Sequence, residues 1–400
     1  MLAYTMHYMV NISPGLWSPF GCWNVLSKQN YGDTYSFTIF DDLPVELKCD
    51  QEVYEKLIID EFVQYTISFK LATLFGKNYG ILYSIDTDDI IDNREVMKSA
   101  LEEITQPGIV YSQLDWSISN CGQTINGSWG ISGYDINIIP AWGITKGDPS
   151  VIVAVVDTGV DASCDVLQGS LLGNGYDFYN GDDTIYDDYL YDYHGTYIAT
   201  TIALVAPGIK IMPVKFMESS VGAIEDAVEA TRYAIEHGAK IVNMSWNFEE
   251  YSKELYELIK GHPEVLFVNA AGNRNINLEE EKLYPCSYGL ENIITVMAMD
   301  NIGSIYEASG YGVSYVDIAA PGVDVKVIFP ENDETTVSGT SVAAAFVSAA
   351  AALIIFENDA LTPVDAKDII MSSAVKLDKL KNLCRAGGFL DITACLEHMK

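Results

Sequence analysis

Residues 150–159 read Ser-Val-Ile-Val-Ala-Val-Val-Asp-Thr-Gly, and this stretch decides the fold. Its apolar part is continuous and rich in β-branched residues, which is typical of a strand buried on both faces of a parallel sheet. The run ends at Asp157, and open α/β sheets place their ligand sites beyond the carboxyl ends of their strands. The stretch therefore predicts a central parallel strand that presents a carboxylate at the edge of the sheet.

Strand and helix patterns alternate after this stretch. Helical spacing places Ile224, Val228 and Ile235 on one face of a helix that Gly238 closes. This alternation predicts an α/β fold, a three-layer αβα sandwich with a mostly parallel sheet, over residues 128–400. The other strands are expected at 209–215, 240–244, 265–268, 293–298 and 315–319, and the other helices at 253–260 and 342–356.

The residues before 128 have a different sequence pattern. Residues 1–33 are irregular and stay unassigned, whereas residues 34–127 predict a small α+β module that ends in a linker. Its strands are expected at 35–40, 79–85 and 109–112, its helices at 52–68 and 93–104, and the linker, rich in Asn, Gly and Ser, at 117–128.

The chain of 400 residues is strongly acidic, because 56 Asp and Glu against 23 Lys and Arg give a formal charge of −33. This charge argues against nucleic acid or an anionic membrane as a partner and favours the attraction of cationic peptides. A solvated acidic surface without a specific partner explains the same composition. No Lys or Arg precedes Lys28, so no secretory signal is expected. The longest apolar stretch, 342–356, is shorter than the ~20 residues of a membrane span and predicts a buried helix.

The cysteines indicate neither a zinc site nor a disulfide framework, because they are odd in number, scattered and without a CxxC pair. Free buried thiols are the default interpretation. The seven are Cys22, Cys49, Cys121, Cys164, Cys286, Cys384 and Cys395.

Two further segments complement Asp157, namely Tyr193-His194-Gly195-Thr196 and Ser338-Gly339-Thr340-Ser341. A serine hydroxyl needs a base within hydrogen-bonding reach, and the base needs a third group that fixes its tautomer. Singly, each segment has a structural interpretation, such as a helix cap or a buried histidine. Jointly they predict that Ser341 is a nucleophile, His194 its base and Asp157 the orienting carboxylate.

Asn273 supplies a fourth element, at the end of the predicted strand in Val268-Asn269-Ala270-Ala271-Gly272-Asn273. Its amide can donate to a tetrahedral oxyanion together with the backbone N–H of Ser341, and one such donor contributes ~3–4 kcal/mol to transition-state stabilisation. An ordinary turn asparagine is the alternative.

Residues from about 129 to 400 resemble a complete serine endopeptidase of the subtilisin family. The order Asp, His, Ser along the chain is that of subtilisin and differs from the orders in chymotrypsin and the α/β-hydrolases. Further matching motifs are Trp-Gly-Ile at 129–131, Ala-Trp-Gly-Ile-Thr at 141–145, Val-Ala-Pro at 205–207, Lys-Ile-Met-Pro-Val-Lys at 210–215, Val-Asn-Met-Ser at 242–245, Tyr-Pro at 284–285 and Ala-Pro-Gly at 320–322.

The resemblance implies a hydrolysis of peptide bonds through an acyl-enzyme. It implies the roles given above for the three residues of the triad and for Asn273 in the oxyanion hole. It also implies that Ser245, Trp246 and Asn247 bind the substrate by pairing with its peptide backbone. It also implies that residues 34–127 are an inhibitory propeptide, so that the protein is a zymogen cut near residues 110–128. The alternative is that this module is an unrelated small domain. We expect the protein to be a monomer.

The sequence departs from the family pattern at several positions. Tyr197, Thr200 and the pair Ala345-Phe346 replace residues that pack in the family and carry no reacting atom. The usual calcium loop is missing, since Leu204 runs directly into Val205-Ala206-Pro207, so we expect no bound metal and no other cofactor.

The wall of the specificity pocket is also altered. Trp246-Asn247-Phe248 stand where the family has small residues, which predicts a narrowed or reshaped cleft. This leaves a narrow-specificity processing or leader peptidase open as an alternative. A catalytically impaired pseudoprotease that only binds peptides is a second alternative, against which the intact candidate residues argue.

An acidic loop lies between Gly175 and His194. It predicts either a patch at the cleft edge that selects basic substrates or a cation, or an ordinary solvated loop. Its aspartates are Asp177, Asp182, Asp183, Asp187, Asp188 and Asp192.

Overall fold

The computed structural model describes residues 8–11, 29–31, 34–36, 66–74, 77–86, 115–120, 122, 124–125, 128–186, 193–219 and 221–399. The chain forms two compact units. One comprises Met1–Trp116 with Asn120–Tyr134, and the other Ser117–Ser119 with Asp135–Lys400.

The described secondary-structure elements of the first unit are strands. β1 (Tyr8–Asn11), β5 (Lys77–Asp86) and β4 (Thr66–Leu74) form an antiparallel sheet in the order β1-β5-β4. Two hairpins accompany it, one of β2 (Gln29–Tyr31) with β3 (Thr34–Ser36) and one of β6 (Thr124–Ile125) with β7 (Ser128–Trp129).

The strand predicted at 79–85 is confirmed within β5, and the strand predicted at 35–40 overlaps β3. The helix predicted at 52–68 is wrong at its end, because Thr66–Leu74 is strand β4. Ile67, Phe69 and Leu71 alternate with polar or small residues there, which is the period of a strand. Residues 52–65, the helix predicted at 93–104 and the strand predicted at 109–112 lie outside the described residues.

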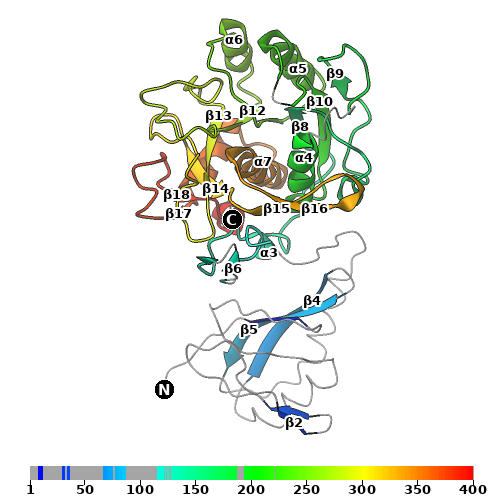
Figure 1. The fold of residues 1–400 in the computed structure, drawn as a ribbon, viewed down its shortest axis with the longest axis vertical. Helices are drawn as coiled ribbons and strands as arrows, with labels where there is room; N and C mark the ends of the chain where they lie inside the picture. The colour runs from blue at the N-terminus through cyan, green and yellow to red at the C-terminus, as the bar shows by residue number, and fades with distance from the viewer. Residues whose placement is uncertain are drawn as a thin grey trace. The chain divides into compact units, whose positions relative to one another are not determined.

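In the second unit the described residues form a nine-stranded sheet in the order β17-β18-β14-β13-β12-β11-β8-β10-β9 (Figure 1). All neighbours pair in parallel except β17 with β18. The strands are β8 (Ile152–Asp157), β9 (Tyr176–Asp177), β10 (Lys210–Lys215), β11 (Ile241–Met244), β12 (Leu266–Ala270), β13 (Ile293–Met299), β14 (Ile318–Pro321), β17 (Val375–Lys376) and β18 (Gly388–Phe389).

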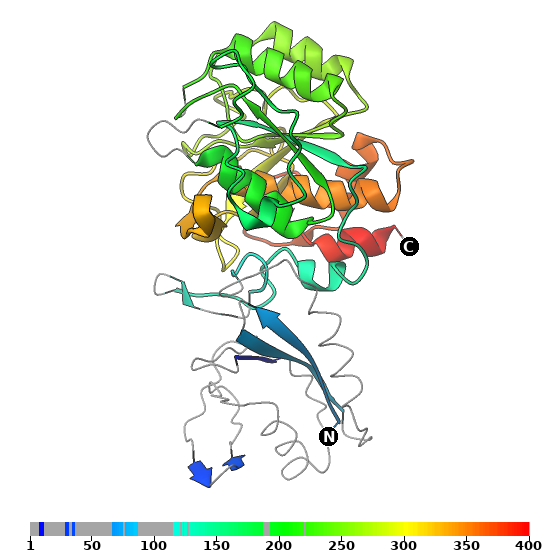
Figure 2. The same cartoon turned by 90° about the vertical axis from the view of Figure 1, so that its right-hand side faces the viewer.

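Helices cover both faces of this sheet, so the predicted three-layer αβα sandwich is confirmed. Figures 1 and 2 show α5 (Ile224–Glu236) and α6 (Lys253–Gly261) on one side, and α4 (His194–Val205) and α7 (Thr340–Glu357) on the other. The remaining elements are α3 (Ile138–Ala141), α8 (Pro363–Ser372), α9 (Ile392–His398), the short helices η1 (Asp165–Leu167) and η2 (Pro330–Asn332), and the hairpin β15 (Val325–Ile328) with β16 (Glu334–Val337).

Helix α7 packs along strands β11 to β14 and against α4. In the described part of the chain it is the one helix long and apolar enough to cross a membrane, but most of it is buried inside the domain. Its alanines are fully buried, and its first turn lies at the carboxyl edge of the strands, where Ser341 is hydrogen-bonded to Ser245 just after β11. It is the core helix that the sequence predicts at 342–356.

The parallel sheet places distant sequence segments at one edge. Asp157 is the last residue of β8, Ser245 follows β11, and Asn273 follows β12 by three residues. Because parallel strands share one carboxyl edge, these side chains are brought together across more than a hundred residues of sequence. The strand predicted at 315–319 begins only at Ile318, because the N–H groups of Tyr315 and Val316 donate to the carbonyl of Gly312 in a turn and not to the neighbouring strand.

Candidate active site

His194 and Asp157 are in direct contact. The Nδ1 atom of His194 lies 2.6 Å from Oδ1 of Asp157, which is fully buried at the end of β8. The same carboxylate oxygen accepts a hydrogen bond of 2.8 Å from the backbone N–H of Thr158. The carboxylate therefore holds the imidazole with a proton on Nδ1, which leaves Nε2 able to act as a base.

Gly195 allows this contact, because helix α4 begins right against strand β8. A Cβ on Gly195 would lie 2.2 Å from the carbonyl oxygen of Gly159 and 3.2 Å from the Cβ of Asp157. The Gly195 N–H donates to the hydroxyl of Thr158 at 2.9 Å. Any side chain at this position would push the helix, and with it His194, away from the strand.

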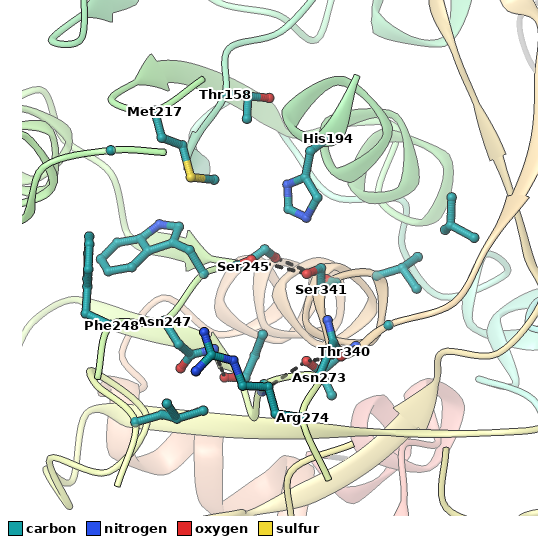
Figure 3. A pocket seen from close by; sticks show the side chains of 18 of the residues that line it. Thr158, His194, Met217, Ser245, Asn247, Phe248, Asn273, Arg274, Thr340 and Ser341 are labelled. Carbon is teal, nitrogen blue, oxygen red and sulfur yellow. Dashed lines mark hydrogen bonds between the residues drawn. The ribbon is translucent and has the colours of Figure 1, made fainter. Parts of the chain in front are cut away.

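Ser341 lies in the first turn of α7 and lines the same pocket as His194, a cavity of about 460 Å³. Figure 3 shows the His194 ring pointing toward Ser341 across this pocket. The Ser341 hydroxyl donates to the backbone carbonyl of Ser245 at 3.1 Å. The first four N–H groups of a helix lack intrahelical acceptors, so the Ser341 N–H is available to an anion in the pocket.

Asn273 also lines the pocket, and its orientation is fixed by Thr340. The side-chain oxygen of Asn273 accepts from the Thr340 N–H at 2.9 Å and from the Thr340 hydroxyl at 3.0 Å. The Thr340 hydroxyl in turn accepts from the N–H of Gly272 at 3.1 Å. With its oxygen occupied, Asn273 can offer only its NH₂ group to a ligand, which is the donor that an oxyanion requires.

Sequence reasoning missed the orienting role of Thr340. Its only signal is the position directly before the nucleophile, where a small residue is expected in any case. The contact joins residues 67 positions apart, so no local pattern reveals it.

The Ser245 side chain faces α7, where it belongs to a buried polar chain. Ser348 donates to Oδ1 of Asn243 at 2.9 Å, Asn243 donates to the Ser245 hydroxyl at 2.9 Å, and that hydroxyl donates to the Ser341 carbonyl at 3.1 Å. Each hydroxyl in the chain has a donor or acceptor partner, and such a satisfied network stabilises one geometry. Sequence reasoning missed this chain too, although Ser348 interrupts an otherwise apolar helix.

Trp246, Asn247 and Phe248 line one wall of the pocket. The Trp246 indole N–H donates to the carbonyl of Val156 at 2.8 Å, so the ring braces the strand that carries Asp157. The Asn247 amide donates to the Ala270 carbonyl at 3.1 Å, whereas its Oδ1 atom is buried and has no partner among the described residues.

The acidic loop contributes less to the cleft than its sequence suggests. Asp177 is fully buried, lies 3.5 Å from the buried ammonium of Lys215, and accepts from the N–H groups of Tyr179 and Asn180. It therefore holds the turn after β9 and cannot belong to a substrate-selecting patch. Asp182 and Asp183 are exposed, and Asp187, Asp188 and Asp192 lie outside the described residues.

No group of three or more His, Cys, Asp or Glu side chains suited to a metal ion occurs in the described part of the chain. The expectation of no bound metal stays a prediction. Cys164, Cys286, Cys384 and Cys395 are buried free thiols, and none of them lines the pocket.

The sequence profile of the subtilase family matches residues 148–388. The thermophilic serine proteinase of Bacillus sp. (strain AK1) is 35% identical over 218 residues, which are 50% of this chain and 51% of that protein. The major intracellular serine protease of Bacillus subtilis (strain 168) is 32% identical over 269 residues, 61% of this chain and 82% of that protein.

The solved structure of the prenylagaramide maturation protease is 26% identical and superposes with a TM-score of 0.55, covering 66% of this chain and 98% of that one. The chain spans about half or less of the length of the first curated relatives it matches.

Proposed function

Because this chain belongs to the subtilase family of serine proteases, we propose that it is an endopeptidase in which Ser341, His194 and Asp157 form the catalytic triad. The observation that carries the proposal is the 2.6 Å contact of His194 with Asp157 beside a pocket that His194 shares with Ser341. Peptide or protein chains are the substrates.

The reaction follows from this arrangement. The Ser341 hydroxyl leaves the Ser245 carbonyl, transfers its proton to Nε2 of His194 and attacks the scissile carbonyl carbon. The Asn273 NH₂ group and the Ser341 N–H stabilise the oxyanion, and the Asp157 carboxylate stabilises the imidazolium. His194 then gives its proton to the leaving amine, and water hydrolyses the acyl-enzyme by the same steps in reverse.

Substrate backbone is expected to pair with the segment of Ser245, Trp246 and Asn247. The position of these three residues in the lining of the pocket supports this. We further propose a monomeric zymogen, in which residues 34–127 act as an intramolecular inhibitor that is removed by cutting near residues 110–128. The support for this part is family membership.

A fluorophosphonate probe and a mass measurement test the proposal. The full chain is expected to react with the probe at Ser341 and to shorten itself on storage, whereas Ser341→Ala does neither. Ser372→Ala, which removes an exposed hydroxyl on α8, serves as the matched control and keeps both properties. A chain that neither reacts nor cleaves any peptide is the pseudoprotease of the alternative hypothesis, and the proposal is then wrong.

A further inference from the structure

The pocket extends away from His194 into a section lined by residues of segments 245–248 and 270–274 (Figure 3). The leaving amine must receive its proton from His194, so the leaving group lies toward that residue. The side chain of the residue that contributes the scissile carbonyl, here called the acyl-side residue, then enters the section between segments 245–248 and 270–274. This inference rests on the proposed function.

Two contacts define the depth of this section. Leu283 packs so closely on Gly272 that a Cβ on the glycine would lie 2.6 Å from Cδ1 of Leu283 and 3.7 Å from Nδ2 of Asn247. Leu283 is itself buried. Leu283 therefore closes the bottom of this section and forms its floor. The acyl-side residue is then recognised by the side chains at the rim of the section.

Arg274 is the one Lys or Arg among the described residues that line the pocket, and none of those residues is Asp or Glu. Figure 3 shows its guanidinium extending from the Asn273 segment toward Asn247. A single cation without a lining carboxylate is notable in a chain of formal charge −33. The lining of the pocket therefore offers a cationic side chain to a substrate and no carboxylate of its own.

The guanidinium is accessible to a substrate. It is paired with Glu249, but the two side chains are 61% and 66% exposed, and pairs of this kind are weak because solvent screens them. One contact occupies only part of a guanidinium, which carries five N–H donors in a planar fork suited to a carboxylate. A substrate carboxylate can share the guanidinium with Glu249 or displace it.

We propose that Arg274 makes this protein selective for substrates with Asp or Glu as the acyl-side residue. The carboxylate of that residue accepts from the guanidinium above the floor formed by Leu283. This selectivity is the reverse of the basic preference that the acidic composition suggests.

Three fluorogenic peptides that differ only in having Glu, Gln or Lys as the acyl-side residue test the proposal on the full chain. For a rim-exposed pair we expect kcat/KM to be about two- to fivefold higher for Glu than for Gln, equivalent to about 0.4–1 kcal/mol. In Arg274→Gln the ratio of Glu to Gln falls to about one, and Arg274→Glu moves the preference to Lys. Raising the salt concentration should reduce the ratio in the unaltered protein.

Arg232→Gln is the matched control, because Arg232 also forms exposed pairs, with Glu229 and Glu254, and lies outside the pocket lining. Its Glu to Gln ratio stays that of the unaltered protein. Equal cleavage of the Glu and Gln peptides, or a ratio that survives Arg274→Gln, overturns the role of Arg274. Reaction of Ser341 with the probe in that experiment leaves the proposed function standing, whereas absence of both reaction and cleavage overturns the two together.

Discussion

Ser341 and Ser245 are joined by two hydrogen bonds that run in opposite directions. The hydroxyl of Ser341 donates to the carbonyl of Ser245 at 3.1 Å, and the hydroxyl of Ser245 donates to the carbonyl of Ser341 at 3.1 Å. The pair ties the first turn of α7 to the end of β11. The candidate nucleophile is therefore fixed by the sheet as well as by its own helix.

The polar chain behind this pair should be needed for stability. Ser348→Ala leaves Oδ1 of the fully buried Asn243 without its donor, and an unsatisfied buried acceptor costs about 1–3 kcal/mol. Urea unfolding of the variant measures the loss. The control Ser372→Ala should change the free energy of unfolding by less than about 0.5 kcal/mol. Equal stabilities of the two variants would contradict the role given to the chain.

The orientation of Asn273 should depend on the Thr340 hydroxyl. We expect Thr340→Val, which keeps the shape and removes the donor, to lower kcat by about tenfold, as the loss of one hydrogen bond of about 1.4 kcal/mol would. Thr340→Ser keeps the hydroxyl and should retain most of kcat. For comparison, Asn273→Ala, which removes the amide altogether, should lower kcat by about 10²–10³-fold. If Val and Ser at position 340 give the same kcat, Thr340 does not position the amide.

Asp157→Asn should show that Asp157 orients the His194 imidazole for catalysis and is not needed for folding. An amide at this position can present its NH₂ group to His194, which favours the wrong tautomer of the imidazole, and kcat should fall by about 10⁴. The melting temperature of the variant should remain within a few degrees of the original, because the residue shape is unchanged. A variant with full activity would show that the carboxylate at 2.6 Å from His194 has no part in the reaction.

Gly195→Ala should disrupt both stability and activity. The added methyl group meets the backbone of Gly159 at 2.2 Å, and backbone cannot rotate away as a side chain does. Gly261→Ala is the control, since a Cβ there has no neighbour within 4 Å. Thermal unfolding should show a lower midpoint for Gly195→Ala alone.

Two buried thiols should make the fold sensitive to alkali. Burial raises the pKa of Cys286 to about 12, and burial together with the nearby charge of Asp391 raises the pKa of Cys395 to about 12. Unfolded thiols titrate near pH 8.5, so between about pH 8.5 and 12 the folded chain binds more protons than the unfolded chain. The stability contribution is complete below about pH 8.5, and above it each thiol lowers the free energy of unfolding by up to about 1.4 kcal/mol per pH unit.

Urea unfolding at pH 7.5 and pH 10 measures this loss, and Cys395→Ala should show a shallower pH dependence than the unaltered chain. In the folded state at pH 8 the two thiols should resist alkylation by iodoacetamide, because the thiolate is the reactive form. Rapid alkylation of both without unfolding would contradict their burial.

Much of the second unit could be predicted from local pattern. The β-branched run before Asp157 and the alternation after it are properties of short segments, and β8, β10, β11, β12 and β13 lie within a few residues of the predicted positions. In the first unit the strand Thr66–Leu74 was missed, because its first residues, 66–68, fit both the end of the helical pattern of 52–68 and the start of a strand pattern. Periodicity alone cannot separate the two in so short a run.

The sequence by itself determined which chemical groups the protein has and that parallel strands would deliver Asp157 and Asn273 to one edge. Only the tertiary structure decided which atoms those groups offer. Thr340 turns the Asn273 amide, Lys215 removes Asp177 from the cleft, and Arg274 places a cation in the pocket of an acidic protein. The reason is physical: hydrogen bonds and ion pairs act over a few ångströms, and these connect residues that are far apart in the chain and meet only after folding.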